Sequence, residues 1–221
     1  MMSKTVIPTG YAPLLDLYQT QTAIGFLKRN FEQKLCDALN LKRVSAPLFV
    51  EPSTGLNDDL NGVERPVAFD IKETGRVAQV VHSLAKWKRM ALYKYGFKAG
   101  EGLYTDMNAI RRDEEMDNLH SVYVDQWDWE KVITPADRTL DYLQTTVRAI
   151  SGAIAGTLSE LKTHYPQLTT ELPAEVAFVT TQQLEDLYPA MSPKERENAY
   201  LKEHKAVFLM QIGGRLRSGL R

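Results

Sequence analysis

Hydrophobic positions recur at helical spacing in two segments of this chain, and each segment predicts a helix. Apolar residues at three- and four-residue steps follow Thr22, which is a suitable N-cap, and predict a helix there. A second stripe follows Thr134-Pro135-Ala136-Asp137 and predicts a long helix. The two stripes are Ile24, Leu27, Phe31, Leu35 and Leu39, then Leu140, Leu143, Val147, Ile150, Ile154, Leu158 and Leu161.

Shorter elements fill the rest of the chain. Ser83 is a predicted N-cap for a helix through Tyr95 that stops at Gly96, and helices are also predicted at 181–187 and 192–204. Pro47 interrupts a strand-like run over 41–50 and indicates an edge, a bulge or a subunit seam. Further strands are predicted at 66–71 and 78–81 around a turn at Gly75, at 175–180 and at 206–212, so the fold class is α+β.

The most informative pattern is a predicted hairpin between Met107 and Glu130. Its first strand ends in Arg111, and its second alternates so that His120, Val122, Val124, Gln126, Asp128 and Glu130 share one face. Such a face is no plain core face, because buried carboxylates are costly unless they are paired. Arg111 supplies a partner charge, so the hairpin is predicted to form the floor of a site for a charged small molecule.

Composition excludes several classes of protein. The 221 residues carry a net charge of −1, which argues against a nucleic-acid binder that relies on bulk electrostatics. One cysteine permits no intrachain disulfide, and neither a signal-peptide run nor a membrane-spanning window is found, so a cytoplasmic protein without a membrane partner is expected. The four histidines share no zinc-ligand spacing, and neither a P-loop nor a dinucleotide fingerprint occurs.

Four groups of residues are candidates for chemistry, each with a structural alternative. Arg111 could clamp a nucleotide α-phosphate or form an ion pair with Asp113 or Glu114. Gln126 could bind substrate while Asp128 and Glu130 hold an ammonium group or Mg²⁺, or the three could form a satisfied polar network.

Loop and helix residues supply the other candidates. Lys86, Lys88 and Arg89 open a helix, where a substrate carboxylate would offset their unfavourable position on the helix dipole. A solvated basic face is the alternative. Asp58 and Asp59 lie in a loop and could act as a base or an ammonium ligand, or serve only in the turn.

Several sequence segments closely resemble one family, the ammonia-dependent asparagine synthetases, or aspartate–ammonia ligases. The resemblance covers about residues 22–221 and implies a class II aminoacyl-tRNA synthetase-like antiparallel sheet flanked by helices, in a single catalytic domain over 1–221. The segments are Val44-Ser45-Ala46-Pro47, His82-Ser83-Leu84-Ala85-Lys86-Trp87-Lys88-Arg89, Gly100-Glu101-Gly102-Leu103-Tyr104-Thr105, the run from His120 to Glu130, Ala206-Val207-Phe208-Leu209 and Ile212-Gly213-Gly214.

The resemblance implies a reaction in which ATP and L-aspartate give β-aspartyl-AMP, which ammonia converts to L-asparagine and AMP. ATP and Mg²⁺ are the implied cofactors, and a homodimer the implied assembly. The implied catalytic residues are Arg111, Asp58 and Gln126; the substrate-binding residues Ser83, Lys88, Gln126 and Asp128; the nucleotide-binding residues Arg111, Glu114, His120 and Ser121; and the dimer-interface residue Pro47.

Members of that family continue beyond position 221, with a third motif and further acidic residues around Mg²⁺. We therefore expect a C-terminally truncated form with low or no activity alone and place no metal ligand in this chain; asparagine formation by the isolated chain would contradict this expectation. The alternative function is a non-catalytic paralogue of aspartyl- and asparaginyl-tRNA synthetases that binds an amino acid or AMP.

Overall fold

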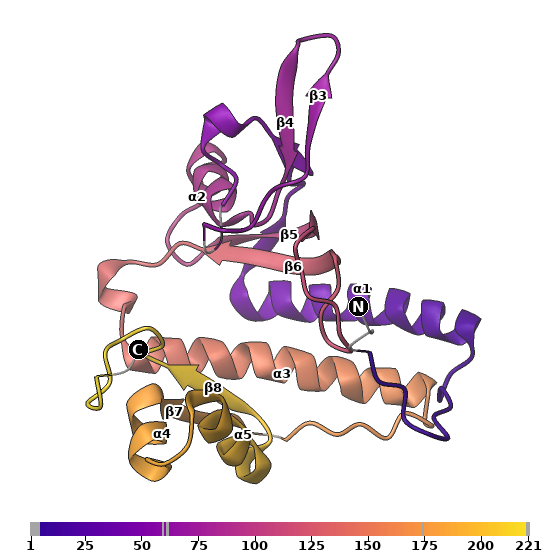
Figure 1. Ribbon diagram of the computed structural model, residues 1–221, viewed down its shortest axis with the longest axis vertical. Coiled ribbons are helices and arrows are strands. Elements are labelled where there is room, and N and C mark those ends of the chain that lie inside the picture. The colour runs from indigo at the N-terminus through magenta and orange to yellow at the C-terminus, as the bar shows by residue number, and fades with distance from the viewer. Residues whose placement is uncertain (1–4, 59, 61, 174, 220–221) are drawn as a thin grey trace. The chain divides into compact units, whose positions relative to one another are not determined.

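A computed structural model describes residues 5–58, 60, 62–173 and 175–219 of the chain (Figure 1). The chain divides into two compact units, each with its own set of contacts. One catalytic domain over the whole chain stays a prediction. Within the described part of the chain, no helix has the length and apolar character that crossing a membrane requires. The first unit comprises Met1–Pro13 and Leu39–Pro135, and the second comprises Leu14–Ala38 and Ala136–Arg221.

The predicted hairpin forms the main sheet of the first unit. Strands β5 and β6 pair antiparallel along nine residues each, with Met107 opposite Gln126 and Thr105 opposite Asp128. The short strand β1 adds to β5 in parallel, so this sheet is mixed and has the order β1-β5-β6. The bounds are Leu41–Arg43 for β1, Gly102–Ile110 for β5 and Tyr123–Lys131 for β6.

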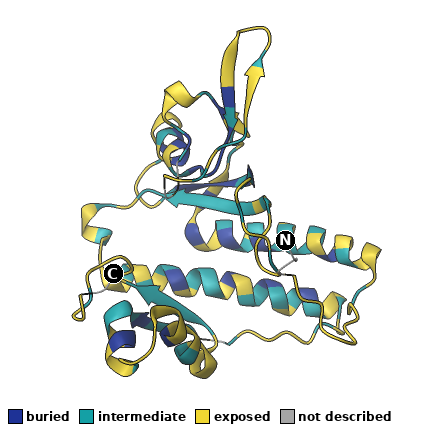
Figure 2. Ribbon diagram, viewed as in Figure 1, coloured by how far each residue is buried: buried dark blue, intermediate teal, exposed yellow. Residues whose placement is uncertain are grey.

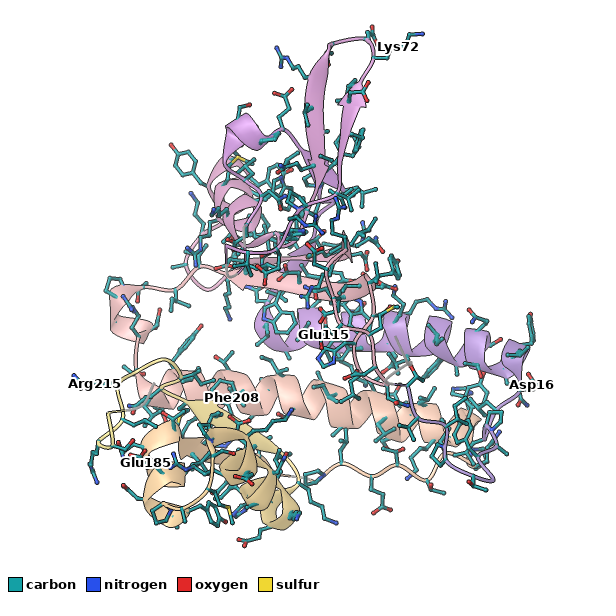
Figure 3. The ribbon with its side chains drawn as sticks, in the orientation of Figure 1. Asp16, Lys72, Glu115, Glu185, Phe208 and Arg215 are labelled. Carbon is teal, nitrogen blue, oxygen red and sulfur yellow. The ribbon has the colours of Figure 1, made fainter. Side chains whose placement is uncertain are left out.

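A second, antiparallel sheet in the same unit has the order β2-β4-β3. Pro47 breaks the predicted 41–50 strand into two, because β1 ends at Arg43 and β2 begins only at Phe49. The turn predicted at Gly75 is confirmed, and Gly75 has a positive φ of 65°. Lys72 lies at the tip of this hairpin (Figure 3). The bounds are Phe49–Val50 for β2, the 3-10 turn Pro52–Thr54, Ala68–Ile71 for β3 and Arg76–Val80 for β4.

Helix α2, Ala85–Lys94, packs its apolar side against the main sheet and closes the core of the first unit. Its buried residues recur at helical spacing, with exposed positions between them, and are Trp87, Lys88, Ala91 and Leu92 (Figure 2). The prediction that Ser83 is the N-cap is wrong, because the helix begins one residue later and Leu84 occupies the cap; the Ser83 hydroxyl still accepts a hydrogen bond from the Ala85 N–H at 3.2 Å. The core residues are Val50, Val81, Leu84, Trp87, Ala91, Leu92, Leu103, Met107 and Ala109.

Two long helices, α1 (Leu17–Leu39) and α3 (Leu140–His164), lie side by side in the second unit (Figure 1). Lys34 of α1 pairs with Glu160 of α3 at 2.6 Å. The prediction that Thr22 caps α1 is wrong. Asp16 takes that role, because its carboxylate accepts the Gln19 N–H at 2.7 Å while the Gln19 side chain accepts the Asp16 N–H.

The remaining elements of the second unit follow α3. Thr139 caps α3 by accepting the Tyr142 N–H at 3.2 Å, so the predicted start at Thr134 is wrong and Pro135–Asp137 is a separate 3-10 turn. The helix predicted at 192–204 is confirmed, and a capping box between Ser192 and Glu195 opens it. Strands β7 and β8 pair in parallel. The bounds are Ala177–Thr180 for β7, Thr181–Leu187 for α4, Pro193–His204 for α5 and Val207–Met210 for β8.

Candidate functional site

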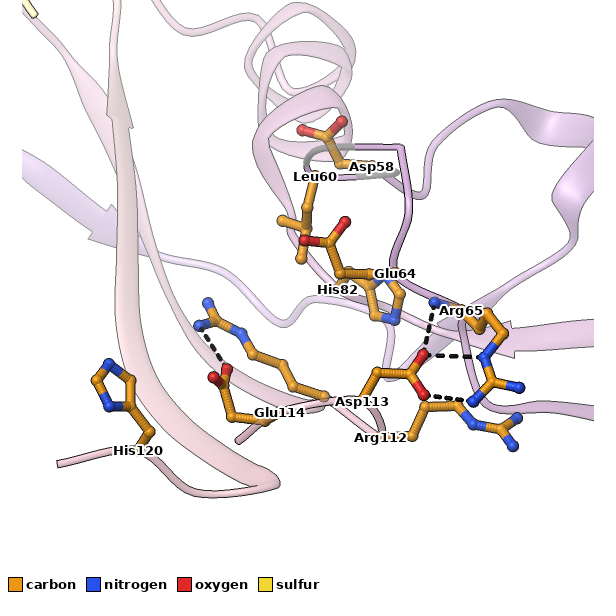
Figure 4. A pocket seen from close by; sticks show the side chains of 10 residues that line it. Asp58, Leu60, Glu64, Arg65, His82, Arg112, Asp113, Glu114 and His120 are labelled. Atoms are coloured by element: carbon orange, nitrogen blue, oxygen red, sulfur yellow. Dashed lines mark hydrogen bonds and ion pairs between the residues drawn. The ribbon is translucent and has the colours of Figure 1, made fainter. Parts of the chain in front are cut away.

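A cleft of about 640 Å³ opens in the first unit and carries charges of both signs (Figure 4). Four predicted site residues line it: Asp58, Arg111, Glu114 and His120. Arginine, histidine and carboxylate side chains together suit a charged ligand that has more than one functional group. The other described residues that line the cleft are Leu60, Glu64, Arg65, His82, Arg112 and Asp113.

Arg111 reaches the cleft because it follows β5 directly and its N–H donates to the Val122 carbonyl at 2.8 Å. Its Nη1 lies 3.8 Å from Glu114 Oε2, so the predicted alternative of an ion pair with Glu114 is present. Its Nε is nevertheless buried and has no hydrogen-bond partner among the residues that the structure describes. A buried donor without a partner is costly, and an anionic ligand in the cleft would supply the missing acceptor.

Arg65 and Asp113 form a bidentate ion pair at the edge of the same cleft (Figure 4). Arg65 Nε lies 3.1 Å and Nη2 2.5 Å from the carboxylate oxygens, and the Arg65 N–H also donates to Asp113 at 3.1 Å. These hydrogen bonds lower the pKa of Asp113 to about 2, with the side-chain bond from Arg65 as the largest cause. Asp113 is therefore the partner of Arg65 and not of Arg111.

Asn57 fixes the wall of the cleft that carries Asp58 and His82. Its Oδ1 accepts the N–H of the buried His82 at 2.9 Å and that of Asp58 at 3.1 Å. Its Nδ2 donates to the Val80 carbonyl at 3.3 Å. Lys86 adds a cation 3.9 Å from Asp58, so the Asp58 carboxylate is held between a fixed loop and a positive charge. Asp59 lies outside the described residues.

The opposite wall carries His120, which Asp117 orients. Asp117 Oδ1 accepts the N–H groups of Leu119 and His120 at 2.7 and 2.8 Å and lies 2.9 Å from His120 Nδ1. The pKa of Asp117 is lowered, first by the Leu119 backbone bond and then by His120. Ser121 accepts the Tyr123 N–H at 3.3 Å and is not among the described lining residues.

A second polar group lies between α2 and β6. The buried Lys88 ammonium contacts Asp128, donates to the Trp129 carbonyl at 2.9 Å and lies 3.4 Å from Glu130. The Gln126 amide nitrogen lies 3.4 Å from the Met107 sulfur. This arrangement has the form of the satisfied polar network considered as the alternative. The predicted residues Ser83, Lys88, Gln126, Asp128 and Pro47 are not among the described residues that line the cleft, and their binding roles stay predictions.

The sequence patterns missed six of the lining residues. Arg65 and Asp113 are 48 positions apart, and no spacing rule connects an arginine before β3 with an aspartate after β5. His82 begins one of the segments that resemble the family, and that resemblance was the one signal that could have identified it. Within the described ranges, no three His, Cys, Asp or Glu side chains are grouped to hold a metal ion.

Solved structures share the fold of this chain. Asparaginyl-tRNA synthetase from Entamoeba histolytica, solved in complex with asparaginyl-adenylate, superposes on 90% of the chain and 45% of its own with a TM-score of 0.58 and 10% identity. The enzyme from Pyrococcus horikoshii, also solved with asparaginyl-adenylate, covers 85% of the chain and 44% of its own with a TM-score of 0.57 and 12% identity. The predicted class II synthetase-like fold is confirmed.

Sequence comparison gives the family. The aspartate–ammonia ligase from Ruminiclostridium cellulolyticum is 59% identical over all of this chain and 66% of its own length. That from Lactobacillus johnsonii is 57% identical over 97% of this chain and 64% of its own length. The chain thus spans about two thirds of the length of these relatives. A model of the aspartate–ammonia ligase family matches residues 18–221, and the chain therefore belongs to that family.

Proposed function

We propose that this protein works as an ATP-dependent aspartate–ammonia ligase. ATP and L-aspartate would give β-aspartyl-AMP and pyrophosphate, and ammonia would then displace AMP to give L-asparagine. Family membership supports this reaction, since relatives that are 56–59% identical carry the name of the activity. The proposal concerns the whole protein, to which this chain contributes the cleft around Arg111.

The observation that carries the proposal is the buried Nε of Arg111 in the cleft, which has no hydrogen-bond partner in the described part of the chain. A guanidinium has a planar fork of donors that matches phosphate, and it keeps its charge at any physiological pH. Negative charge grows on the α-phosphate when a carboxylate attacks it, and a donor fixed in advance stabilises that charge most effectively. Arg111 is therefore the proposed phosphate ligand, with Glu114, His120 and Ser121 around the nucleotide.

The second step needs unprotonated ammonia, because an ammonium ion has no lone pair with which to attack a carbonyl carbon. Asp58 is the proposed group that removes a proton from the incoming ammonium ion or holds the amino group of aspartate. Its position on a wall of the cleft, fixed through Asn57, supports either role. Gln126 completes the proposed catalytic set.

L-Aspartate binding is proposed for Ser83, Lys88, Gln126 and Asp128. Of the three contacts of the Lys88 ammonium, that to Glu130 is the longest at 3.4 Å. It is the contact that a substrate carboxylate would replace. Mg²⁺ would enter with the phosphates of ATP, where it usually keeps several waters. A homodimer with Pro47 at its interface and a cytoplasmic location complete the proposal.

The test compares Arg111→Ala with Arg76→Ala, an arginine of the same unit that pairs with Glu51 outside the described lining of the cleft. Thermal unfolding is followed with ATP plus L-aspartate, with AMP or L-asparagine alone, and without ligand. Saturating substrates should raise the melting temperature of the unmodified chain, since a ligand that binds only the folded state stabilises it. Arg111→Ala should lose that increase, and Arg76→Ala should keep it.

Asparagine formation from ATP, L-aspartate and ammonium chloride is measured in parallel. If ATP and aspartate do not change the melting temperature of the unmodified chain or of any variant, the proposal is contradicted. A response to AMP or asparagine alone, without product, would instead favour the binding paralogue.

A further inference from the structure

We propose that Arg65 and Asp113 are positioning residues, whose ion pair holds the turn after β5 in the orientation that presents Arg111 to a nucleotide phosphate. The inference rests on the proposed function, because it assigns these two residues a part in the same site. Arg65 was not a candidate from sequence, Asp113 was considered only as an ion-pair partner of Arg111, and its carboxylate is already fully engaged by Arg65. Its part is thus to act through Arg111.

The geometry places Asp113 inside the turn that carries Arg111. The Glu114 N–H donates to the Arg111 carbonyl at 3.1 Å, so Arg111 and Glu114 are the ends of a four-residue turn. The Arg111 N–H donates to Val122 at 2.8 Å and anchors one end of that turn to the hairpin. The other anchor is Asp113, held from outside by Arg65.

The contact between Arg65 and Asp113 restrains the turn more strongly than a single ion pair would. The guanidinium contacts both carboxylate oxygens, and the Arg65 main-chain N–H donates to one of them at 3.1 Å. A bidentate pair fixes the plane of the carboxylate, and the main-chain contact ties it to the segment just before β3. The turn is therefore held at Val122 on one side and at Arg65 on the other, where Figure 4 shows the contact with Asp113.

A second ion pair of the same unit provides a matched control. Arg76 and Glu51 lie 3.0 Å apart, and their side chains are 66% and 32% exposed, against 68% and 30% for Arg65 and Asp113. Neither Arg76 nor Glu51 is among the described residues that line the cleft. If both pairs serve stability alone, their removal should have equal effects, which are small for exposed pairs.

The experiment compares Asp113→Ala with Glu51→Ala in the full 221-residue chain. Affinity for ATP is measured in the presence of L-aspartate by calorimetric titration, and the exchange of the Glu114 amide is followed by hydrogen–deuterium exchange without ligand. Asp113→Ala should weaken ATP binding about fivefold, the factor that corresponds to the upper range for an exposed pair. It should also speed exchange at Glu114, whereas Glu51→Ala should change neither.

Charge reversal provides the rescue. Arg65→Asp alone should weaken ATP binding at least as much as Asp113→Ala, and Arg65→Asp combined with Asp113→Arg should recover part of the loss. Equal effects of Asp113→Ala and Glu51→Ala on both measurements, or no recovery in the double variant, would overturn the inference. If the unmodified chain fails to bind ATP, the proposed function fails; unchanged Glu114 exchange in Asp113→Ala overturns the positioning role independently of it.

Discussion

The ammonium of Lys88 donates to the Trp129 carbonyl at 2.9 Å and contacts the Asp128 carboxylate, although the Lys88 side chain is only 6% exposed. A lysine this deeply buried must keep its charge paired, because an uncompensated ion in a protein interior is strongly destabilising. The pair joins α2 to β6 and thereby connects the helix to the hairpin that carries Arg111.

Replacing Lys88 by methionine should reduce the free energy of unfolding by about 3 kcal/mol, because Asp128 would lose its cation in a partly buried position. Urea unfolding followed by tryptophan fluorescence is the suitable measurement, since all three tryptophans lie in the first unit. Lys86→Met is the control, because the Lys86 side chain is half exposed, and it should change the unfolding free energy by less than about 1 kcal/mol. A Lys88 variant as stable as this control would refute the structural role.

Arg196 and Glu185 form a second buried pair, in the second unit, where Glu185 is a residue of α4 (Figure 3). Ser218 donates to the same carboxylate at 2.5 Å and helps to lower the pKa of Glu185. Arg196→Met should reduce the free energy of unfolding by about 3 kcal/mol, because Glu185 would remain buried without its cation. The control is Arg217→Met, because Arg217 is exposed and lies 3.2 Å from Asp186. It should reduce the free energy of unfolding by less than about 1 kcal/mol. Circular dichroism during urea unfolding measures both, and equal losses would contradict the prediction.

The Arg65–Asp113 pair predicts a pH dependence of stability. The folded pKa of Asp113, about 2, lies below its ordinary value of 3.8, so the folded state favours the ionised carboxylate. Its contribution is therefore fully present above pH 3.8 and is lost as the pH falls toward 2. The difference in melting temperature between the unmodified chain and Asp113→Ala should shrink over that interval. A difference that grows below pH 3.8 would have the wrong sign.

Gly102 should resist substitution because the main chain of β6 and the side chain of Leu41 approach it closely. A Cβ there would lie 2.6 Å from the Glu130 carbonyl oxygen and 2.6 Å from a Leu41 methyl carbon. Gly102→Ala should therefore destabilise the chain by about 1–3 kcal/mol. Gly152→Ala is the contrasting variant, since a Cβ in the middle of α3 meets nothing within 4 Å and alanine favours helix by about 1 kcal/mol. Denaturant unfolding checks both, and a neutral Gly102→Ala would contradict the first prediction.

Long periodic elements were predictable from sequence, and their first residues were not. The stripes of α1 and α3 gave the right helices, because burial of one face selects residues at helical spacing. Their starts differed because Asp16 and Thr139 are better placed caps than Thr22 and Thr134. Several residues near a helix start can accept a backbone N–H, and sequence alone does not say which does so.

The candidate site was predictable only in part, for a similar reason. Arg111 was a candidate from its position at the end of a strand, the family resemblance assigned it to the site, and it lines the cleft. Arg65 was not identified, because its partner Asp113 comes near only through the pairing of distant segments. Lys88 and Asp128 were assigned to substrate from their charge and the family resemblance, whereas their pairing with each other depends on how α2 packs on β6. Local patterns report residue chemistry, and packing decides which partner each group meets.

Asn57 has a consequence for how this cleft can change through mutation. Its amide binds main-chain groups of Val80 and His82, and no feature of their side chains enters those contacts. Substitutions at 80 and 82 can therefore alter the shape and chemistry of the wall while its path stays fixed. Asn57 itself cannot be replaced as freely, because few side chains of its length both donate and accept a hydrogen bond. Evolution can therefore vary the residues that line the cleft only while the Asn57 amide is retained.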